Sequence, residues 1–403
     1  MKSTSNIKLA SSEQCTGCSA CVNVCPQSCV TMDVNILGAI HPRIDTNHCI
    51  KCGLCIKTCP SLVTFEKNYD VSPISYTIQS KDDDVLLNSS SGGAFFEIAR
   101  YVINEGGVVF GVCFNGVHVQ HDWTDTLEGV KSFMGSKYVQ SDIGLTYVKV
   151  REFLKEGRVV LFSGTPCQVV GLRKYLNDSY NKLITIDLIC HGVTNPIVWE
   201  NYIISLKNKL KIDDFISIKF RAKFDDYSQG CNYYTFYVRY KHGETVNLYL
   251  EPRQENLYYS YFSRNYYRES CYYCKYRSVE SSVADFTIGD SVMCGQSPDN
   301  KKMVSTMVVH STNGRNVLNA IQNNINIFPL DLIRLHEYYY QARIDEDIQK
   351  KNRPWRLVNL LSKYVPLKFI RPLYMHDTVN VIVERKILKY AKKIQNRILF
   401  RCV

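Results

Sequence analysis

The pattern of apolar and polar positions predicts a series of alternating helices and strands after residue 74. Ala94 to Ile103 has the spacing of an amphipathic helix that begins with a serine cap, and Val108 to Phe114 is a continuous apolar segment typical of a buried strand. The same succession returns at Tyr147 to Glu156 and Val159 to Phe162. Helices and strands in alternation predict an α/β domain.

The succession continues with a helix at Gln168 to Leu176 and a buried strand at Leu183 to Ile189. The loops that follow two of the strands carry Cys167 and Cys190. Ligands of α/β sheets bind at the carboxyl ends of strands, so we expect these loops to face a binding site. Residues 215–250 alternate apolar and polar, which predicts antiparallel strands of an additional sheet.

These patterns divide the chain into three predicted domains. Residues 1–66 contain two short strands, Val30 to Met32 and Ile44 to Asp45, and a polar linker follows at Lys67 to Pro73. The α/β domain with its additional sheet occupies 74–310, and a helical, basic C-terminal region occupies 311–403. The overall fold class is therefore predicted as α+β.

Cysteine spacing identifies the first domain. Two runs have the pattern C-x2-C-x2-C-x3-C-P, which binds two 4Fe-4S clusters as in bacterial ferredoxins. In this pattern the fourth cysteine of each run crosses to the other cluster. The predicted ligands are Cys15, Cys18, Cys21 and Cys59 for cluster one, and Cys49, Cys52, Cys55 and Cys25 for cluster two.

Zinc sites would leave half of these cysteines without a role, because zinc takes four ligands in two pairs. Gly17 and Gly53 each lie next to the second cysteine of a run, before it in the first run and after it in the second, where a turn around the cluster leaves little space for a side chain. Cys29 lies just outside the first run, and we interpret it as a small buried hydrophobe.

Composition limits the remaining possibilities. A length of 403 residues predicts two or three domains, and 17 cysteines with a ferredoxin-like region predict a reducing compartment. No apolar run of membrane-spanning length and no apolar signal segment occur, so we expect a cytoplasmic protein. The net charge of +11 is scattered, which argues against nucleic acid and suits an acidic electron carrier, an anionic cofactor or a membrane surface.

Four later cysteines form a second candidate site. Cys167 and Cys190 follow strands, while Cys271 and Cys274 form a C-x2-C pair, so four thiolates are available for a further cluster. Two alternatives stay open at this point. In the first, Cys167 and Cys190 are ordinary buried residues, and the Cys271/Cys274 pair binds zinc or nothing. In the second, Cys167 is a reactive thiol with His191 as its base.

Several long stretches resemble the coenzyme F420 hydrogenase/dehydrogenase beta-subunit family. They are SSGGAFFEIARYVINEGGVVFGVCF, GSKYVQSDIG, VVLFSGTPCQVVGL, IDLICHGV and CYYCKYRSVESSVADFTIGD. The resemblance covers about residues 10 to 310. It implies an iron-sulfur flavoprotein with FAD in the α/β domain, and it makes Cys167, Cys190, Cys271 and Cys274 the ligands of a third 4Fe-4S cluster.

The resemblance also implies which residues bind FAD. They are Ser91, Gly92, Gly93, Ser136, Lys137, Tyr138, Gln140, Ser141, Gly164, Thr165 and Gln168. The Ser91–Gly93 segment precedes a predicted helix whose N-terminus would suit a pyrophosphate, although a tight turn explains it equally well. Lys137 is the predicted catalytic residue, because a positive charge stabilises the anionic reduced flavin; the alternative is a solvated surface lysine.

Together these features predict an FAD-dependent iron-sulfur oxidoreductase. Ferredoxin or another redox protein would supply electrons, which pass through the clusters to FAD and on to an organic acceptor. The resemblance suggests the deazaflavin coenzyme F420 or another small molecule, with a link to surface-polysaccharide synthesis. The alternative is a non-catalytic electron-transfer subunit. A basic amphipathic segment near the C-terminus would suit a partner or the inner membrane surface.

Overall fold

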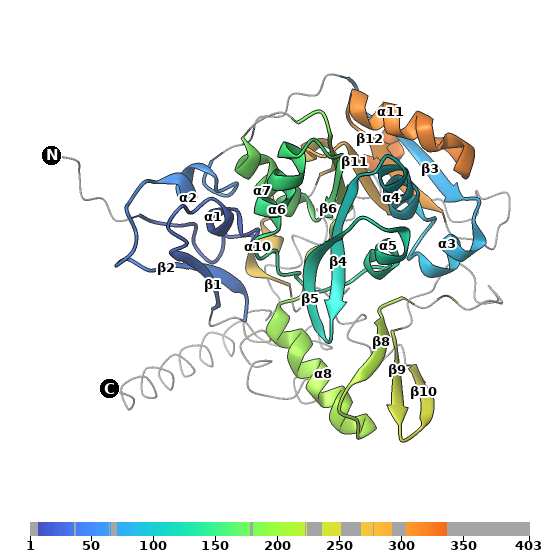
Figure 1. Ribbon diagram of the computed structural model, residues 1–403, viewed down its shortest axis with the longest axis horizontal. Helices are drawn as coiled ribbons and strands as arrows, with labels where there is room; N and C mark the ends of the chain where they lie inside the picture. Colours follow the sequence, from blue (N-terminus) through green and yellow to red (C-terminus); the bar gives the residue numbers. More distant parts are fainter. Residues whose placement is uncertain are drawn as a thin grey trace.

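The computed structural model describes a dicluster domain that lies beside a large mixed α/β domain (Figure 1). It describes residues 7–336 except 36–37, 64, 66–70, 178–179, 222, 224–235, 251–266, 277 and 292–303. The basic segment near the C-terminus and its predicted membrane contact lie outside the described residues. Within the described part of the chain, no helix is both long and apolar enough to cross a membrane.

The N-terminal domain has the repeated layout that its cysteine runs predict. The hairpin of β1 (Val30–Val34) and β2 (Ile40–Ile44) is antiparallel, and each cysteine run contains one short helix, α1 (Ala20–Asn23) or α2 (Leu54–Lys57). The residue before each helix is left-handed, with φ of 58° at Ser19 and 76° at Gly53. The conformation at Gly53 supports the turn proposed for this glycine.

An eight-stranded mixed sheet forms the centre of the larger domain (Figure 1). Its order is β13-β3-β12-β11-β7-β6-β4-β5. The strands β4, β6, β7 and β11 run parallel as neighbours, and β5, β12, β3 and β13 pair antiparallel with the strands beside them. The bounds are Ile74–Ser80 (β3), Val108–Asn115 (β4), His118–Thr124 (β5), Val160–Gly164 (β6), Leu183–Leu188 (β7), Phe286–Asp290 (β11), Ser305–Val309 (β12) and Ile325–Leu330 (β13).

Helices cover both faces of this sheet. The amphipathic helix α4 (Ala94–Asn104) packs with α5 (Leu127–Phe133) and α11 (Thr312–Ile321) on one face, where Ile98 and Leu161 are fully buried. On the other face, α6 (Thr146–Lys155) and α7 (Pro166–Leu176) form a second core. This second core also contains Cys18 and Ala20 of the dicluster domain, so the cluster domain packs directly on the sheet domain.

The predicted additional sheet is present. Strands β8 (Phe215–Lys219), β9 (Tyr237–His242) and β10 (Thr245–Leu250) form an antiparallel sheet in the order β10-β9-β8. Helix α8 (Pro196–Leu210) packs on it through Trp199, whose indole N–H donates to Val117 O at 2.7 Å. Shorter elements complete the described fold: α3 (Asp83–Asn88), α10 (Glu269–Tyr272), α12 (Leu332–His336) and the 3-10 turns Val279–Ser281 and Gln322–Asn324.

Two sequence-based expectations are wrong. The α/β domain does not end at residue 310, because β13 pairs with β3 and α11 packs against α4. Residues 311–330 therefore complete the central sheet instead of forming part of a purely helical tail. The helix α4 is also not capped by serine: Gly93 occupies the N-cap with φ of 87°, while the Ser91 hydroxyl donates to Val304 O at 2.7 Å.

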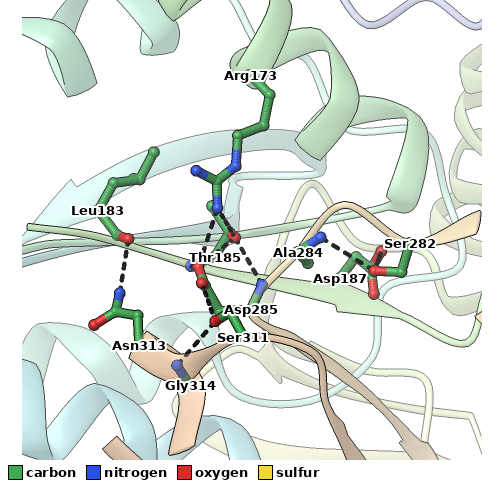
Figure 2. Close-up of polar contacts among 10 residues, drawn as sticks. All are labelled: Arg173, Leu183, Thr185, Asp187, Ser282, Ala284, Asp285, Ser311, Asn313 and Gly314. Atoms are coloured by element: carbon green, nitrogen blue, oxygen red, sulfur yellow. Dashed lines mark hydrogen bonds and ion pairs between the residues drawn. The ribbon is translucent and has the colours of Figure 1, made fainter. Parts of the chain in front are cut away.

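A buried carboxylate fixes the centre of the sheet (Figure 2). The carboxylate of Asp285 accepts hydrogen bonds from Thr185 N and Oγ1 at 2.8 Å each, from Ser311 Oγ at 2.6 Å and from Arg173 Nη2 at 3.1 Å. These donors belong to β7, to the N-cap of α11 and to α7. Asp285 therefore joins both faces of the sheet just before β11.

Candidate iron-sulfur centres

The structure brings the cysteines of cluster two together around one cavity. Cys25, Cys49, Cys52 and Cys55 all line this cavity, and electrostatic interactions couple Cys55 to the other three. Cys52 is exposed, and the exposed apolar side chains of Ile50 and Leu54 also line the cavity. Cluster two would therefore lie at the protein surface.

The cysteines of cluster one lie deeper. Cys21 is coupled electrostatically to Cys15 and Cys59, and Cys18 is coupled to Cys15 and Cys21. This grouping places the last cysteine of the second run beside the first three of the first run, and Cys21 also interacts electrostatically with Cys55 of the other set. Cys15 and Cys18 are buried against the sheet domain.

The four later cysteines also converge. Cys167 at the start of α7, Cys190 after β7, and Cys271 and Cys274 in and after α10 line a single cavity. Cys271 is coupled electrostatically to the other three. Four cysteines around one cavity are the donor set of a 4Fe-4S cluster, and the same number of thiolates can hold a structural zinc ion.

Cluster one and the third cysteine set are neighbours. Cys18 is coupled electrostatically to Cys167, and Thr16 of the first cysteine run lines the cavity of the third set. A Cβ atom added to Gly171 on α7 would lie 3.1 Å from Cys18 Sγ, so the glycine allows the close approach. The order in space is the cluster-two set at the surface, the cluster-one set in the middle and the third set over the sheet.

A buried arginine, Arg268, links these two inner sets. Its Nε donates to Cys15 O at 2.8 Å, and its Nη1 donates to Gln140 Oε1 at 2.8 Å. Arg268 is only 1% exposed and interacts electrostatically with Cys167. Sequence reasoning missed this residue, because an arginine three residues before a cysteine has no distinctive pattern.

Two unsatisfied polar atoms fit the presence of clusters here. Arg268 Nη2 and Thr16 Oγ1 are buried and have no hydrogen-bond partner in the described part of the chain. Buried donors without partners are costly, and the sulfur atoms of iron-sulfur clusters accept hydrogen bonds. The four thiolates of each inner set, together with these two donors, therefore suit a 4Fe-4S cluster better than a zinc ion, which offers no sulfide acceptors.

Burial favours the protonated form of several thiols in the two inner sets. Burial raises the pKa of Cys21 and of Cys167 to about 12, and burial raises the pKa of Cys18 and of Cys271 above the ordinary thiol value. Thiolate is the form that binds iron, so cluster assembly at neutral pH releases protons from these groups.

The residues predicted to bind FAD lie in two groups. One group surrounds the start of α7: Gln168 Nε2 donates to Ser141 Oγ at 3.0 Å and Gln168 Oε1 accepts from Thr165 N at 2.9 Å. Gln140 Nε2 donates to the carbonyls of Thr16 and Gly17 at 3.3 Å each. These side chains support the loops that carry the cluster cysteines. Gly164, the last residue of β6, packs against Gln168.

The other group lies at the start of α4. Ser136 N donates to Ser90 Oγ at 2.6 Å, which places the 136–138 loop beside the Ser91–Gly93 turn. A Cβ atom on Gly92 would lie 2.4 Å from Ile78 O, so strand packing by itself requires this glycine. Tyr138 packs edge-on against Phe220 at 5.6 Å between ring centroids.

Lys137, the predicted catalytic residue, caps a helix. Its Nζ donates to the carbonyls of Ser132, Phe133, Met134 and Gly135 at 3.0 to 3.3 Å, at the end of α5. Burial lowers the pKa of Lys137 to about 8. A lysine at a helix C-terminus is a common stabilising arrangement.

An electropositive site that sequence reasoning missed lies next to the Ser91–Gly93 turn. Lys223 Nζ donates to Ser91 O at 2.7 Å and to Leu86 O at 2.6 Å. Burial, together with the nearby Arg221 charge, lowers the pKa of Lys223 to about 7. Arg221 pairs with Asp290 at the end of β11, with Nη1 2.8 Å from both carboxylate oxygens. Alternating basic residues in the 215–223 strand segment were the available signal.

The two cysteine runs of the N-terminal domain define the chain as an iron-sulfur redox protein, and comparisons with known proteins show what it is similar to. Residues 14–63 match the 4Fe-4S dicluster domain, and residues 157–331 match the C-terminal region of the beta subunit of coenzyme F420 hydrogenase/dehydrogenase. The second match lies within the larger domain and supports the resemblance to the coenzyme F420 hydrogenase/dehydrogenase beta-subunit family. A comparison with curated proteins gave no match.

Among solved structures, a chain of the F420-reducing [NiFe] hydrogenase complex from Methanosarcina barkeri is similar to this protein. The two are 18% identical with a TM-score of 0.48, over 72% of this chain and 96% of that chain.

Proposed function

We propose that this protein passes electrons inward through three 4Fe-4S clusters to FAD, which reduces an organic acceptor. The observation that carries this proposal is the proximity of Cys18 to Cys167, which interact electrostatically. Through it, the dicluster domain adjoins a four-cysteine cavity that lies at the carboxyl ends of β6 and β7. Sheets of this kind bind their ligands at that edge.

Electrons would enter at cluster two, because among the three described cysteine sets this one alone includes an exposed cysteine, Cys52. The surface around it carries exposed apolar side chains and the exposed basic residues Lys51 and Lys57. A small acidic redox protein such as a ferredoxin suits both features. Charge reversal at Lys51 and Lys57 would then slow reduction by ferredoxin mainly at low salt, while reduction by dithionite stays unchanged.

The resemblance to the coenzyme F420 hydrogenase/dehydrogenase beta-subunit family supports FAD as the resident cofactor. The Ser91–Gly93 turn, the N-terminus of α4, and Lys223 would hold its pyrophosphate, because a helix N-terminus and a buried cation favour an anion. When bound, a flavin exchanges electron pairs with organic molecules and single electrons with clusters. Arg221, which pairs with Asp290, adds positive charge at the same edge of the sheet, next to Lys223.

The organic acceptor is proposed as the deazaflavin coenzyme F420 or another small molecule, including one used in surface-polysaccharide synthesis. The competing function is a non-catalytic subunit that relays electrons within a larger redox complex. The packing of the cluster domain on the sheet suits both functions. Only the relay subunit requires a partner protein to accept electrons from its reduced form.

Anaerobic purification with iron, sulfide and flavin analysis tests the proposal. Three clusters predict about twelve iron atoms per chain, and Cys271→Ser should reduce this to about eight while clusters one and two remain. Dithionite-reduced protein is then mixed with F420. Reoxidation of the flavin by F420 supports the enzyme, and about eight iron atoms with no flavin in the wild-type protein would reject the proposal.

A further inference from the structure

A fifth cysteine borders cluster two. Cys29 follows Cys25 by four residues, and the two Sγ atoms are 3.4 Å apart. Its side chain also contacts that of Cys49, a second predicted ligand of the same cluster. Cys29 lines the cavity together with all four predicted ligands.

The position of Cys29 is fixed by the fold. It is 6% exposed and directly precedes β1, and its carbonyl accepts a hydrogen bond from Asp45 N at 2.8 Å at the far end of the hairpin. By contrast, Cys25 is only half-buried and precedes Pro26 in the turn after α1. As a residue, Cys29 is therefore less exposed to solvent than Cys25, the predicted ligand that its sulfur touches.

We propose that Cys29 is a reserve ligand of cluster two that replaces Cys25. In the exchange, the iron-sulfur bond to Cys25 breaks, a bond from iron to Cys29 forms, and the thiol proton of Cys29 passes to the Cys25 sulfur. The contact between the two Sγ atoms provides a direct path for this proton. No atom changes oxidation state, so the step needs no further reactant.

The other half of the dicluster domain provides a natural control. Cys59 is the matching cross-over ligand of cluster one, and the residue four positions later is Val63. Both cysteines precede a proline and accept a backbone hydrogen bond from the residue three positions on, Ser28 N and Leu62 N respectively, at 3.2 Å each. The two turns share this hydrogen bond and differ beyond it, because Ser28 is left-handed with φ of 49° while Val63 N also donates to Cys59 O at 3.0 Å. Of the two turns, only the first carries the extra thiol.

The test compares iron and sulfide content in full-length protein purified without oxygen. If the wild-type protein binds about twelve iron atoms, Cys25→Ala and Cys29→Ala should each retain about twelve, because one of the two sulfurs suffices. Cys59→Ala and the double variant Cys25→Ala/Cys29→Ala should each fall to about eight. The iron count does not depend on FAD or an acceptor, so this inference can fail while the proposed electron path stands.

A transferred ligand provides a second measurement. Cys59→Ala/Val63→Cys should regain the four iron atoms that Cys59→Ala loses, together with the electron paramagnetic resonance signal of reduced cluster one. The inference is overturned if Cys25→Ala loses as much iron as the double variant. It is also overturned if Cys59→Ala keeps all of its iron without any added cysteine.

Discussion

The buried charge of Arg268 should set the reduction potentials of the two inner clusters. Its guanidinium is held by Cys15 O and Gln140 Oε1, next to cluster one, and it interacts with Cys167 of the third set. Reduction adds a negative charge to a cluster, so a nearby cation stabilises the reduced form. We therefore expect Arg268→Gln to lower both potentials.

The magnitude follows from Coulomb's law. At an effective dielectric of about 20, two unit charges interact by about 4 kcal/mol at 4 Å and by about half of that at twice the distance. For a one-electron couple, about 59 mV corresponds to a tenfold change in equilibrium, so about 2 kcal/mol shifts the potential by roughly 90 mV. Since Arg268 is 1% exposed, solvent does little to reduce this interaction.

The assay is a redox titration followed by electron paramagnetic resonance. Arg268→Lys is the matched control, because it keeps the charge and loses the forked hydrogen bonds. Cluster two should keep its potential in both variants, since its cavity does not include Arg268. Equal shifts in both variants, or unchanged inner potentials in Arg268→Gln, would show that the charge is not what sets the potentials.

Three further predictions concern buried groups. His121 is buried and neutral, and burial lowers its pKa to about 4. The free energy of unfolding is therefore highest above about pH 6.5 and falls by up to about 3 kcal/mol as the pH drops toward 4. His121→Gln should reduce this loss, as measured by denaturant unfolding at about pH 7.5 and 5. Lys223 has a pKa lowered to about 7, so the FAD content after dialysis should decrease as the pH rises from about 6 to 8. Lys223→Met should retain little flavin at either pH, with its iron content unchanged. If the variant keeps its flavin, the proposed phosphate site is wrong. Asp285→Ala should lower the free energy of unfolding by about 3 to 5 kcal/mol, because a half-buried Arg173 and three other donors lose their acceptor, and Asp285→Asn should lose less. A change below about 1 kcal/mol in the alanine variant would refute the role of this carboxylate in joining the sheet.

The sequence predicted the elements whose patterns are local. Helix α4 was expected at Ala94 to Ile103 and spans Ala94–Asn104, and the strand expected at Leu183 to Ile189 spans Leu183–Leu188. Both segments are strongly apolar on a face that is buried, so their periodicity reflects their final environment. The 4Fe-4S dicluster domain was predictable for the same reason, since ligand spacing within each run is fixed by the cluster.

Long-range pairing was not predictable. Strand β13 lies next to β3 although they stand far apart in the sequence, and nothing in either segment encodes this partner. The roles of Lys137 and Gly92 were assigned from resemblance, while the structure shows a helix cap and a strand contact at these positions. Arg268 and Lys223 matter because of what surrounds them, which depends on packing between distant segments.

Sheet topology constrains where a ligand can meet the electron path. Since β12 is antiparallel to both β11 and β3, these two strands run in the same direction, and the carboxyl ends of β6, β7, β11 and β3 lie along one edge. Cys167 and Cys190 of the third cysteine set follow β6 and β7, while the Ser91–Gly93 turn follows β3 on the far side of β11 and β12. With strands about 4.8 Å apart, β7 and β3 are separated by about 14 Å. A molecule that binds the turn and also receives electrons from the third cluster must therefore extend across the end of β11, where Arg221 and Asp290 form their ion pair.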